Sequence, residues 1–314
     1  MSVAAPINSS GQAPPRQSGN VARRKFVNRL MLTLCILAAA LAIGILGLVL
    51  FFLLSKGFSS LHFSLFTRVP DNINPGKGGM SQSIFGTLTL LGIAGILGLP
   101  LGILGGIYQL EQRGRFAGMV RFFTDVLNGI PSIVIGIFAY AAIVAPTAAR
   151  HPGHGFSAYA GGFALGILMI PTVMRTTEEI LRLVPFSLRE ASLGLGATRW
   201  RTMWSVVLPA ARGGVITGIM LAFARIAGET APLLFTILGS EYFSTHPILG
   251  GRASAPTLNA PIDALPLRIY NYSQDVSLDK QNLAWAGAVV LISLILVLSI
   301  AARFATRSNF QEEK

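Results

Sequence analysis

The sequence predicts an all-α, polytopic membrane protein with six transmembrane helices. Of its 314 residues, 52% are hydrophobic and only 12% are charged, and the charges leave six long uncharged runs. Soluble globular proteins have about twice this fraction of charged residues, so this composition does not suit an ordinary water-exposed surface. The hydrocarbon core of a bilayer, roughly 30 Å thick, takes about 20 helical residues. Runs of this length favour helices, because the strands of a membrane barrel alternate in polarity over about ten residues.

The six predicted spans divide the chain into a membrane domain and two short tails. They cover approximately residues 30–54, 84–110, 126–149, 156–174, 213–238 and 283–302. The first run is too long for the apolar region of a secretory signal, so we interpret it as a retained anchor. Residues 1–25 are rich in Pro, Ser and Gly and are predicted to be a disordered cytoplasmic tail. Residues 26–305 form the predicted six-helix domain, and 306–314 a cytoplasmic C-terminal tail.

The distribution of Lys and Arg predicts the orientation in the membrane. With the N-terminus inside, the inner segments carry 17 of the 25 basic residues and the outer segments carry 7. Because positively charged loops stay cytoplasmic, both termini and the loop at 185–209 are predicted to be cytoplasmic. The expected location is the plasma membrane, or the inner membrane in a Gram-negative source. This topology explains the net charge of +12, so membrane lipid is an expected partner and nucleic acid is not.

Glycines and prolines inside the spans predict close packing and broken helices. Small residues four apart allow helices in lipid to approach closely, although such spacing identifies no activity. The predicted contact faces carry Gly98, Gly102 and Gly106, the pair Gly162 and Gly166, and the pair Gly214 and Gly218. Prolines at 100, 131, 146 and 171 predict kinks or breaks in the helices. Such breaks are tolerated where neighbouring groups in the bundle form hydrogen bonds to the backbone carbonyls that the proline leaves free.

The polar loop at 185–209 has the features of two short helices. Ser187 and Glu190 form a capping-box pattern, which predicts a helix start, and Gly194 and Gly196 predict its end. A second apolar face follows at helical spacing, with Trp200, Met203, Trp204 and Val207. Two interpretations remain open from this pattern: a docking element that inserts into a groove of a partner protein, or an amphipathic hairpin in the membrane interface.

This loop resembles the EAA loop of ABC importer permeases. The matching residues are Glu190, Ala191, Gly194, Gly196, Leu208 and Pro209, whereas Ser192 and Val206 depart conservatively from the commonest pattern. In that family the loop is a coupling helix that docks on a separate ATP-binding subunit. The resemblance therefore implies the fold of a type I ABC importer permease and assigns these residues to ATPase coupling.

The fifth predicted span contains two charges within apolar sequence. Arg225 and Glu229 lie about one helical turn apart. A charge at the centre of a bilayer costs about 2.5 to 3.5 kcal/mol, so both side chains are expected to face a partner or a water-filled cavity. The pair either lines a substrate pathway or is a structural ion pair that fixes the rotation of the helix.

The string RIAGETAPL at 225–233 and the string LNGIPSIVIG at 127–136 resemble phosphate ABC transporter permease subunits of the PstA type. The resemblance extends over roughly residues 25–305. It implies that Arg225, Glu229 and Thr230 lie on the pathway of inorganic phosphate. It also implies a second homologous permease subunit of the PstC type, a dimer of ATP-binding subunits and an extracytoplasmic phosphate-binding protein. Alternatives are a permease for sulfate or molybdate, a secondary transporter or channel, and a membrane scaffold.

No enzymatic centre is predicted. The chain lacks a G-x-x-x-x-G-K-[ST] phosphate loop, so ATP and Mg are expected on the partner ATPase and no cofactor on this chain. His151 and His154 supply two metal ligands at most, so no metal site is expected. For the long outer segment at 241–281, the resemblance implies a contact with the binding protein or a gate, and a solvated linker is the alternative.

Overall fold

The computed structural model describes residues 21–71, 78–112, 114–151, 155–242, 245–248 and 253–308. It consists of two compact units, residues 1–53 and residues 54–314. Most of helix α1 (Val21–Ser59) belongs to the first unit, and this helix begins inside the predicted N-terminal tail. The rest of that tail, residues 1–20, and residues 309–314 of the predicted C-terminal tail lie outside the described residues.

The described residues contain six helices that are long and apolar enough to cross a membrane, which confirms the predicted number of spans. These are Arg23–Ser59, Ser81–Glu111, Ser132–Arg150, Ala158–Arg182, Arg199–Ala227 and Leu278–Phe304. Several predicted boundaries were wrong: the fourth span continues to Arg182 instead of ending near residue 174, and the fifth starts at Arg199 instead of near residue 213. The third span starts only after a break at Pro131, and the fifth ends at Ala227 instead of continuing to residue 238.

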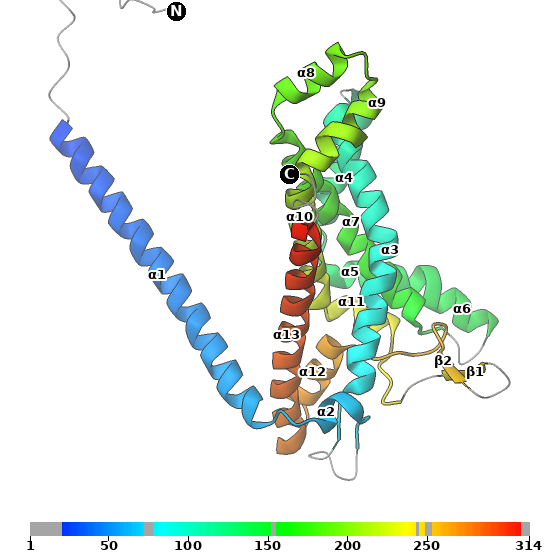
Figure 1. The fold of residues 1–314 in the computed structure, drawn as a ribbon. Coiled ribbons are helices and arrows are strands. Elements are labelled where there is room, and N and C mark those ends of the chain that lie inside the picture. Colours follow the sequence, from blue (N-terminus) through cyan, green and yellow to red (C-terminus); the bar gives the residue numbers. More distant parts are fainter. Residues whose placement is uncertain are drawn as a thin grey trace, which may run out of the picture. The chain divides into compact units, whose positions relative to one another are not determined.

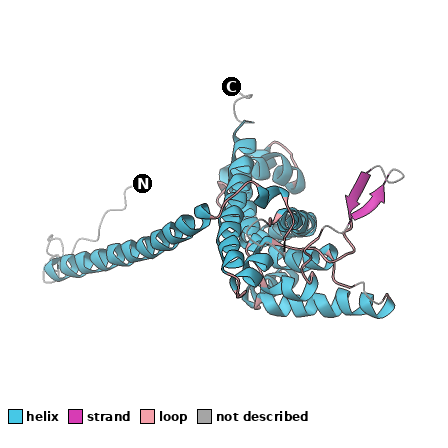
Figure 2. Ribbon diagram, turned by 90° about the horizontal axis from the view of Figure 1, so that it is seen from below, coloured by secondary structure: helices cyan, strands magenta, loops and turns pink. Residues whose placement is uncertain are grey.

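The second unit contains the other helices and one small sheet. The helices are α2 (Ser64–Thr67), α3 (Ser81–Glu111), α4 (Arg115–Gly129), α5 (Ser132–Ala139), α6 (Ala145–Arg150), α7 (Ala158–Arg182), α8 (Phe186–Gly194), α9 (Arg199–Thr202), α10 (Leu208–Ala227), α11 (Ala231–Thr236), α12 (Leu265–Ser273) and α13 (Leu278–Ser308). Strands β1 (Thr245–Ile248) and β2 (Ala253–Pro256) form an antiparallel hairpin, magenta in Figure 2. The predicted all-α class holds for the membrane spans, and the hairpin is an addition that the sequence analysis did not predict.

Helices α3 and α7 lie side by side through the centre of the second unit (Figure 1). Glycines explain their close approach: a Cβ on Gly102 would lie 2.6 Å from the Cβ of Val173, and one on Gly162 would lie 2.4 Å from the side chain of Ile93. Gly98 and Gly106 meet α7 in the same way, and Gly214 and Gly218 of α10 meet Ile180 and Thr176. The predicted glycine faces are therefore confirmed as helix contacts.

Two π-helical segments each lie just before a proline. Segment η3 (Tyr140–Val144) comes before Pro146, and η4 (Met203–Val207) comes before Pro209. Proline has no N–H for the carbonyl four residues earlier, so a shift of the hydrogen-bond register lets the helix continue. Through η4, the helix from Arg199 to Ala227 remains continuous. Within the second unit, α8 and α9 lie at one end of the bundle, and α2 and α12 at the opposite end (Figure 1).

Candidate functional site

Two helix breaks within the apolar bundle form the centre of the candidate site. The first separates α4 from α5 at Ile130 and Pro131, both of which have extended backbones. Proline disfavours the helical conformation of the residue before it, which explains why α4 ends here. The second separates α10 from α11, where Gly228 is the C-cap of α10 and Pro232 lies in the first turn of α11.

The helices that follow the two breaks pack directly against each other. A Cβ on Gly136 of α5 would lie only 2.6 Å from the Cα of Pro232 in α11. Ile135 and Leu233, next to these residues, are buried in the main hydrophobic core. The string LNGIPSIVIG and the string RIAGETAPL, about 100 residues apart in the sequence, are thus brought together in space.

Arg225 and Glu229, the predicted pathway residues, lie on either side of the end of α10. Arg225 is exposed in the last turn of the helix, and Glu229 is half-buried in the break. Among the described residues, neither side chain forms an ion pair or hydrogen bond, so the alternative of a structural Arg225–Glu229 pair is not realised in this conformation. Glu229 follows the C-cap Gly228, so the two residues do not share one continuous helix. The guanidinium of Arg225 is therefore available to a ligand.

Thr230, the third predicted pathway residue, is the N-cap of α11. Its carbonyl accepts hydrogen bonds from the backbone N–H groups of Leu233, at 3.1 Å, and Leu234, at 3.2 Å. The residue is half-buried. Its visible role is to start α11 after the break.

The predicted coupling residues lie in and after a two-helix hairpin formed by α8 and α9. Glu190, Ala191, Gly194 and Gly196 are exposed, and Gly196 has a left-handed backbone with φ of 84°, which explains the glycine at the turn. Leu208 packs against a small core of α3, α7, η4 and α10 residues, and Pro209 lies in the first turn of α10. The sequence therefore predicted the shape of this hairpin correctly.

The caps of this hairpin differ from the prediction. Helix α8 begins after Pro185, so Ser187 lies inside the helix and its side chain makes no cap hydrogen bond. A side-chain cap is found instead at α9, where the Thr198 hydroxyl accepts from the N–H of Arg201 at 3.3 Å. The predicted second apolar face is also divided: Met203 and Val207 are buried, whereas Trp200 and Trp204 are exposed.

Large apolar side chains of the hairpin are exposed. Phe186 is 69% exposed, Leu195 is 90% exposed and Trp200 is 63% exposed. Trp200 and Trp204 stack edge to face, with ring centroids 5.4 Å apart. Exposed apolar groups in an otherwise polar loop are typical of a surface that a partner or a membrane interface covers.

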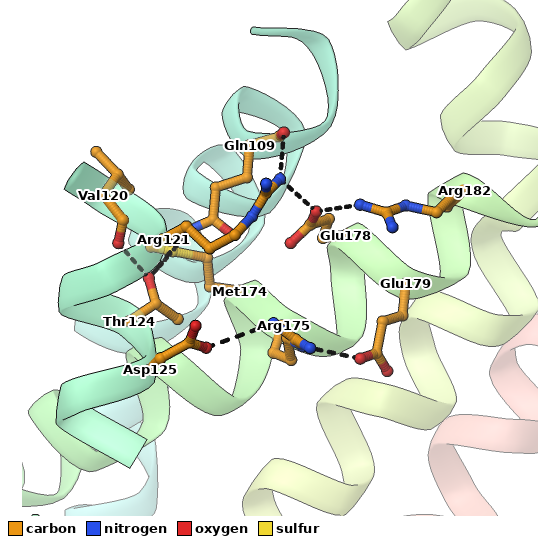
Figure 3. Close-up of polar contacts among 10 residues, drawn as sticks. All are labelled: Gln109, Val120, Arg121, Thr124, Asp125, Met174, Arg175, Glu178, Glu179 and Arg182. Atoms are coloured by element: carbon orange, nitrogen blue, oxygen red, sulfur yellow. Dashed lines mark hydrogen bonds and ion pairs between the residues drawn. The ribbon is translucent and has the colours of Figure 1, made fainter. Parts of the chain in front are cut away.

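A buried carboxylate lies where α3, α4 and α7 meet (Figure 3). Glu178 is 2% exposed and accepts from Arg121 at 2.8 Å and from Arg182 at 2.5 Å. Arg121 also donates to the backbone carbonyl of Gln109. The sequence analysis missed this cluster, although the four-residue spacing of Glu178 and Arg182 was a usable signal.

A second ion-pair network lies at the opposite end, next to α12. Arg268 donates its Nε to Asp263 at 2.7 Å and its Nη2 to the carbonyl of Ser240 at 3.1 Å, and Ser83 of α3 donates to the same carboxylate. Burial raises the pKa of Asp263, and the charge of Arg268 opposes this effect. This network attaches part of the predicted outer segment to α3. Residues 243–244 and 249–252 of that segment lie outside the described residues.

In the described part of the chain, no group of three His, Cys, Asp or Glu side chains could hold a metal ion. His154, one of the two histidines considered above, lies outside the described residues. Cys35 is exposed and free in α1.

Comparisons with known proteins agree with this architecture. The chain is 40% identical over 293 residues to the phosphate transport system permease protein PstA of Haemophilus influenzae, covering 93% of this chain and 96% of the relative. It is 40% identical over 282 residues to the protein of the same name from Yersinia pestis, covering 89% and 90%. With the phosphate transport system permease protein PstA 1 of Mycobacterium tuberculosis it shares 37% identity over 226 residues, covering 72% and 68%.

Solved structures of ABC importers have the same fold. A bacterial alginate ABC transporter matches with a TM-score of 0.59 and 15% identity, covering 93% of this chain and 98% of that chain. The MetNI methionine ABC transporter in an inward-facing conformation matches with a TM-score of 0.51 and 19% identity, covering 73% and 96%. At these identities the likeness shows the fold alone, and it confirms the predicted ABC importer permease fold.

The family described as binding-protein-dependent transport system inner membrane component matches residues 98–309. This range includes both helix breaks and the α8–α9 hairpin. The matched range therefore contains most of the helical bundle. It includes the two packed helix breaks with the exposed Arg225 and the polar hairpin at one end of the bundle. The chain therefore belongs to the family of binding-protein-dependent transport system inner membrane components.

Proposed function

We propose that this chain is one of two permease subunits of an ATP-driven importer of inorganic phosphate. The observation that carries the proposal is the 40% identity, over 93% of the chain, to a relative named as a phosphate transport system permease. We further propose a second permease of the PstC type, a dimer of ATP-binding subunits and an extracytoplasmic phosphate-binding protein as partners. ATP hydrolysis, with its Mg, belongs to the ATP-binding subunits in this proposal.

The chemistry of the break after α10 supports phosphate as the transported ion. Phosphate at neutral pH is an anion, which suits the exposed guanidinium of Arg225. It also retains a proton, which a carboxylate such as Glu229 accepts as a hydrogen bond, whereas fully ionised sulfate offers only lone pairs. Glu229 would thus weaken the hold of Arg225 enough for the ion to leave and would penalise sulfate.

The α8–α9 hairpin is the proposed contact with the ATPase. Its exposed Phe186, Leu195 and Trp200 supply apolar anchors of the kind that fill a groove in a partner protein. In the orientation predicted from Lys and Arg, this hairpin and both termini lie in the cytoplasm. The break that follows Arg225 then lies farther from the cytoplasm, at the end of α10 opposite the hairpin.

Uptake assays in cells that lack their own phosphate importers test the substrate. Arg225→Gln is expected to abolish phosphate uptake, and Glu229→Gln is expected to raise sulfate competition relative to the unchanged chain. Arg303→Gln, at an exposed arginine of α13, is the matched control and should retain uptake. Normal uptake in Arg225→Gln would contradict the pathway role, and transport of sulfate or molybdate in place of phosphate would contradict the substrate.

The contact with the ATPase has its own test. Leu195→Asp should prevent co-purification of the ATP-binding subunit, because it places a charge on an apolar contact, whereas Leu234→Asn at an exposed site of α11 should not. Retained transport without a bound ATPase would favour a secondary transporter or channel.

A further inference from the structure

Arg189 joins the α8–α9 hairpin to two membrane helices at once. Its Nη1 donates to Glu111 Oε1 at 2.9 Å, and its Nη2 donates to the backbone carbonyl of Leu181 at 3.0 Å. Glu111 is the last residue of α3, and Leu181 lies in the last turn of α7. The side chains of Arg189 and Glu111 are only 16% and 28% exposed, so water screens this pair less than a surface pair.

The contact with Leu181 lies at a helix end, where the same carbonyl also accepts from the backbone N–H of Val184 at 3.3 Å. The last four carbonyls of a helix have no partner within the helix, and a cation near them is favourable. Among the described residues, the other side-chain hydrogen bond of α8 joins Ser192 to Thr202 of α9, at 2.9 Å, within the hairpin itself. Arg189 therefore makes the polar side-chain contacts that connect α8 to the membrane helices in the described structure.

The two helices that Arg189 contacts behave as one packed pair. Gly98, Gly102 and Gly106 of α3 lie against α7 so closely that a Cβ on any of them would lie within 3.0 Å of an α7 atom. Packed interfaces of this kind shift as units instead of deforming continuously. A displacement of Arg189 is thus passed to α3 and α7 together.

The hairpin has a second connection to the bundle, which is covalent. From Arg199 the chain continues as one helix through η4 and α10 to Ala227, and this helix carries Arg225. A movement of the hairpin reaches α10 through this helix and α7 through the three residues between α7 and α8, whereas Arg189 and Glu111 form the polar contact, among the described residues, that joins the hairpin to the end of α3. Without Arg189, the hairpin loses its polar contacts with the ends of α3 and α7, and only the backbone and apolar packing transmit its movement to that pair.

We propose that Arg189 is a positioning residue that makes the α3–α7 pair follow the α8–α9 hairpin, and that Glu111 is its partner in this role. The inference rests on the proposed function, because it assumes that an ATPase moves the hairpin. Loss of the contact uncouples ATP hydrolysis from transport. It leaves docking of the ATPase intact, because the exposed apolar groups of the hairpin remain.

The first test measures phosphate uptake and ATP hydrolysis on the same proteoliposomes, which contain the complete importer. Arg189→Gln and Glu111→Gln should each lower the phosphate moved per ATP about fivefold, the change that corresponds to about 1 kcal/mol of coupling. The double variant should be no worse than Arg189→Gln alone, because the contact that Glu111→Gln removes is already lost when Arg189 is replaced. Arg189→Lys should be intermediate, since one ammonium cannot reproduce the two-pronged geometry of the guanidinium.

Arg201→Gln in α9 is the matched control, because it removes one exposed positive charge from the same hairpin. It should keep the ratio of the unchanged importer. A merely structural role would lower uptake and hydrolysis together and leave their ratio unchanged. That result, or an equal fall of the ratio in Arg201→Gln, would overturn the proposal.

The second test requires no phosphate and so separates this inference from the proposed substrate. In the complete importer, spin labels are placed on cysteines at Leu104 of α3 and Leu193 of α8, both exposed and neither one of the proposed docking anchors, in a Cys35→Ser background. ATP binding should leave the distance between the labels unchanged when Arg189 is present and should change it in Arg189→Gln. The same distance change in both chains would contradict the inference, even if the importer carried another ion.

Discussion

Gly136 lies so close to Pro232 that a Cβ on the glycine would come within 2.6 Å of the proline Cα. The contact is between backbones, so neither residue can relieve a clash by changing a rotamer. It fixes α5, which follows the first helix break, against α11, which follows the second. Two interruptions that would each be unfavourable in lipid are thus satisfied within the bundle.

Gly136→Ala is expected to destabilise the protein by about 1–3 kcal/mol, because the added methyl group overpacks a backbone contact. Phosphate uptake should fall with it, since the two breaks can no longer pack. Gly92→Ala in α3 is the control: nothing lies within 4 Å of its Cβ position. Thermal unfolding of the detergent-solubilised protein measures both variants. Equal melting temperatures for the two would contradict the close approach.

Glu178→Gln is expected to lower the free energy of unfolding by about 1–3 kcal/mol, because a charge-assisted acceptor for two arginines is lost from a buried site. The neighbouring Glu179→Gln removes an exposed pair with Arg175, so its cost should stay below about 1 kcal/mol. Chemical denaturation of both variants under the same conditions compares them. A larger loss for Glu179→Gln would show that the buried cluster is not the stabilising one.

Arg268→Met should cost roughly 3–5 kcal/mol at neutral pH, because it leaves the buried Asp263 without its counter-ion. Burial already raises the pKa of Asp263, and loss of the arginine should raise that pKa further. A raised folded-state pKa gives stability that is present at low pH and is lost as the pH rises through it. The deficit of the variant should therefore shrink on acidification.

Melting curves between about pH 5 and pH 8 check this expectation for Arg268→Met, since ionisation of Asp263 is the linked event. The double variant Asp263→Asn with Arg268→Met should recover much of the loss and show a weaker pH dependence. A deficit that grows on acidification would contradict the assignment.

At two adjacent positions in the turn after α11, substitutions are expected to change the stability of the protein in opposite directions. Leu238 and Gly239 both have positive φ, of 66° and 76°. The left-handed conformation costs a leucine about 1–2 kcal/mol, because its Cβ clashes with the backbone, and glycine has no Cβ. Leu238→Gly should therefore stabilise the protein, and Gly239→Ala should destabilise it. The side chain of Leu238 is exposed, so little packing is lost. Shifts of the melting temperature in the same direction would refute this account.

The helical class, the number of spans and the glycine contacts could be predicted because each depends on local composition or on spacing along one helix. Gly102 meets Val173 because small residues repeat every four positions on α3, which is visible in the sequence. The hairpin of α8 and α9 was predicted for the same reason, since Gly196 and the spacing of Trp200 and Met203 are local signals.

Features that depend on contacts between distant segments were missed. The pairing of Arg189 with Glu111, 78 positions earlier, leaves no periodic signal in either helix. The end of α10 before Glu229 was also missed, because the apolar run continues through the break and hydropathy alone does not reveal it. The capping box failed because α8 begins after Pro185, so that Ser187 lies inside the helix instead of at its N-cap.

The unbroken helix from Arg199 to Ala227 converts a small rotation at the hairpin into a larger displacement at Arg225. From Arg199 to Arg225 it measures about 40 Å, at about 1.5 Å per residue. A tilt of only about 10° at the hairpin would displace the far end by roughly 7 Å, more than twice the length of a hydrogen bond. A small tilt at the hairpin end is therefore enough to bring the guanidinium of Arg225 within hydrogen-bond distance of an anion at the other end, or to move it out of that distance.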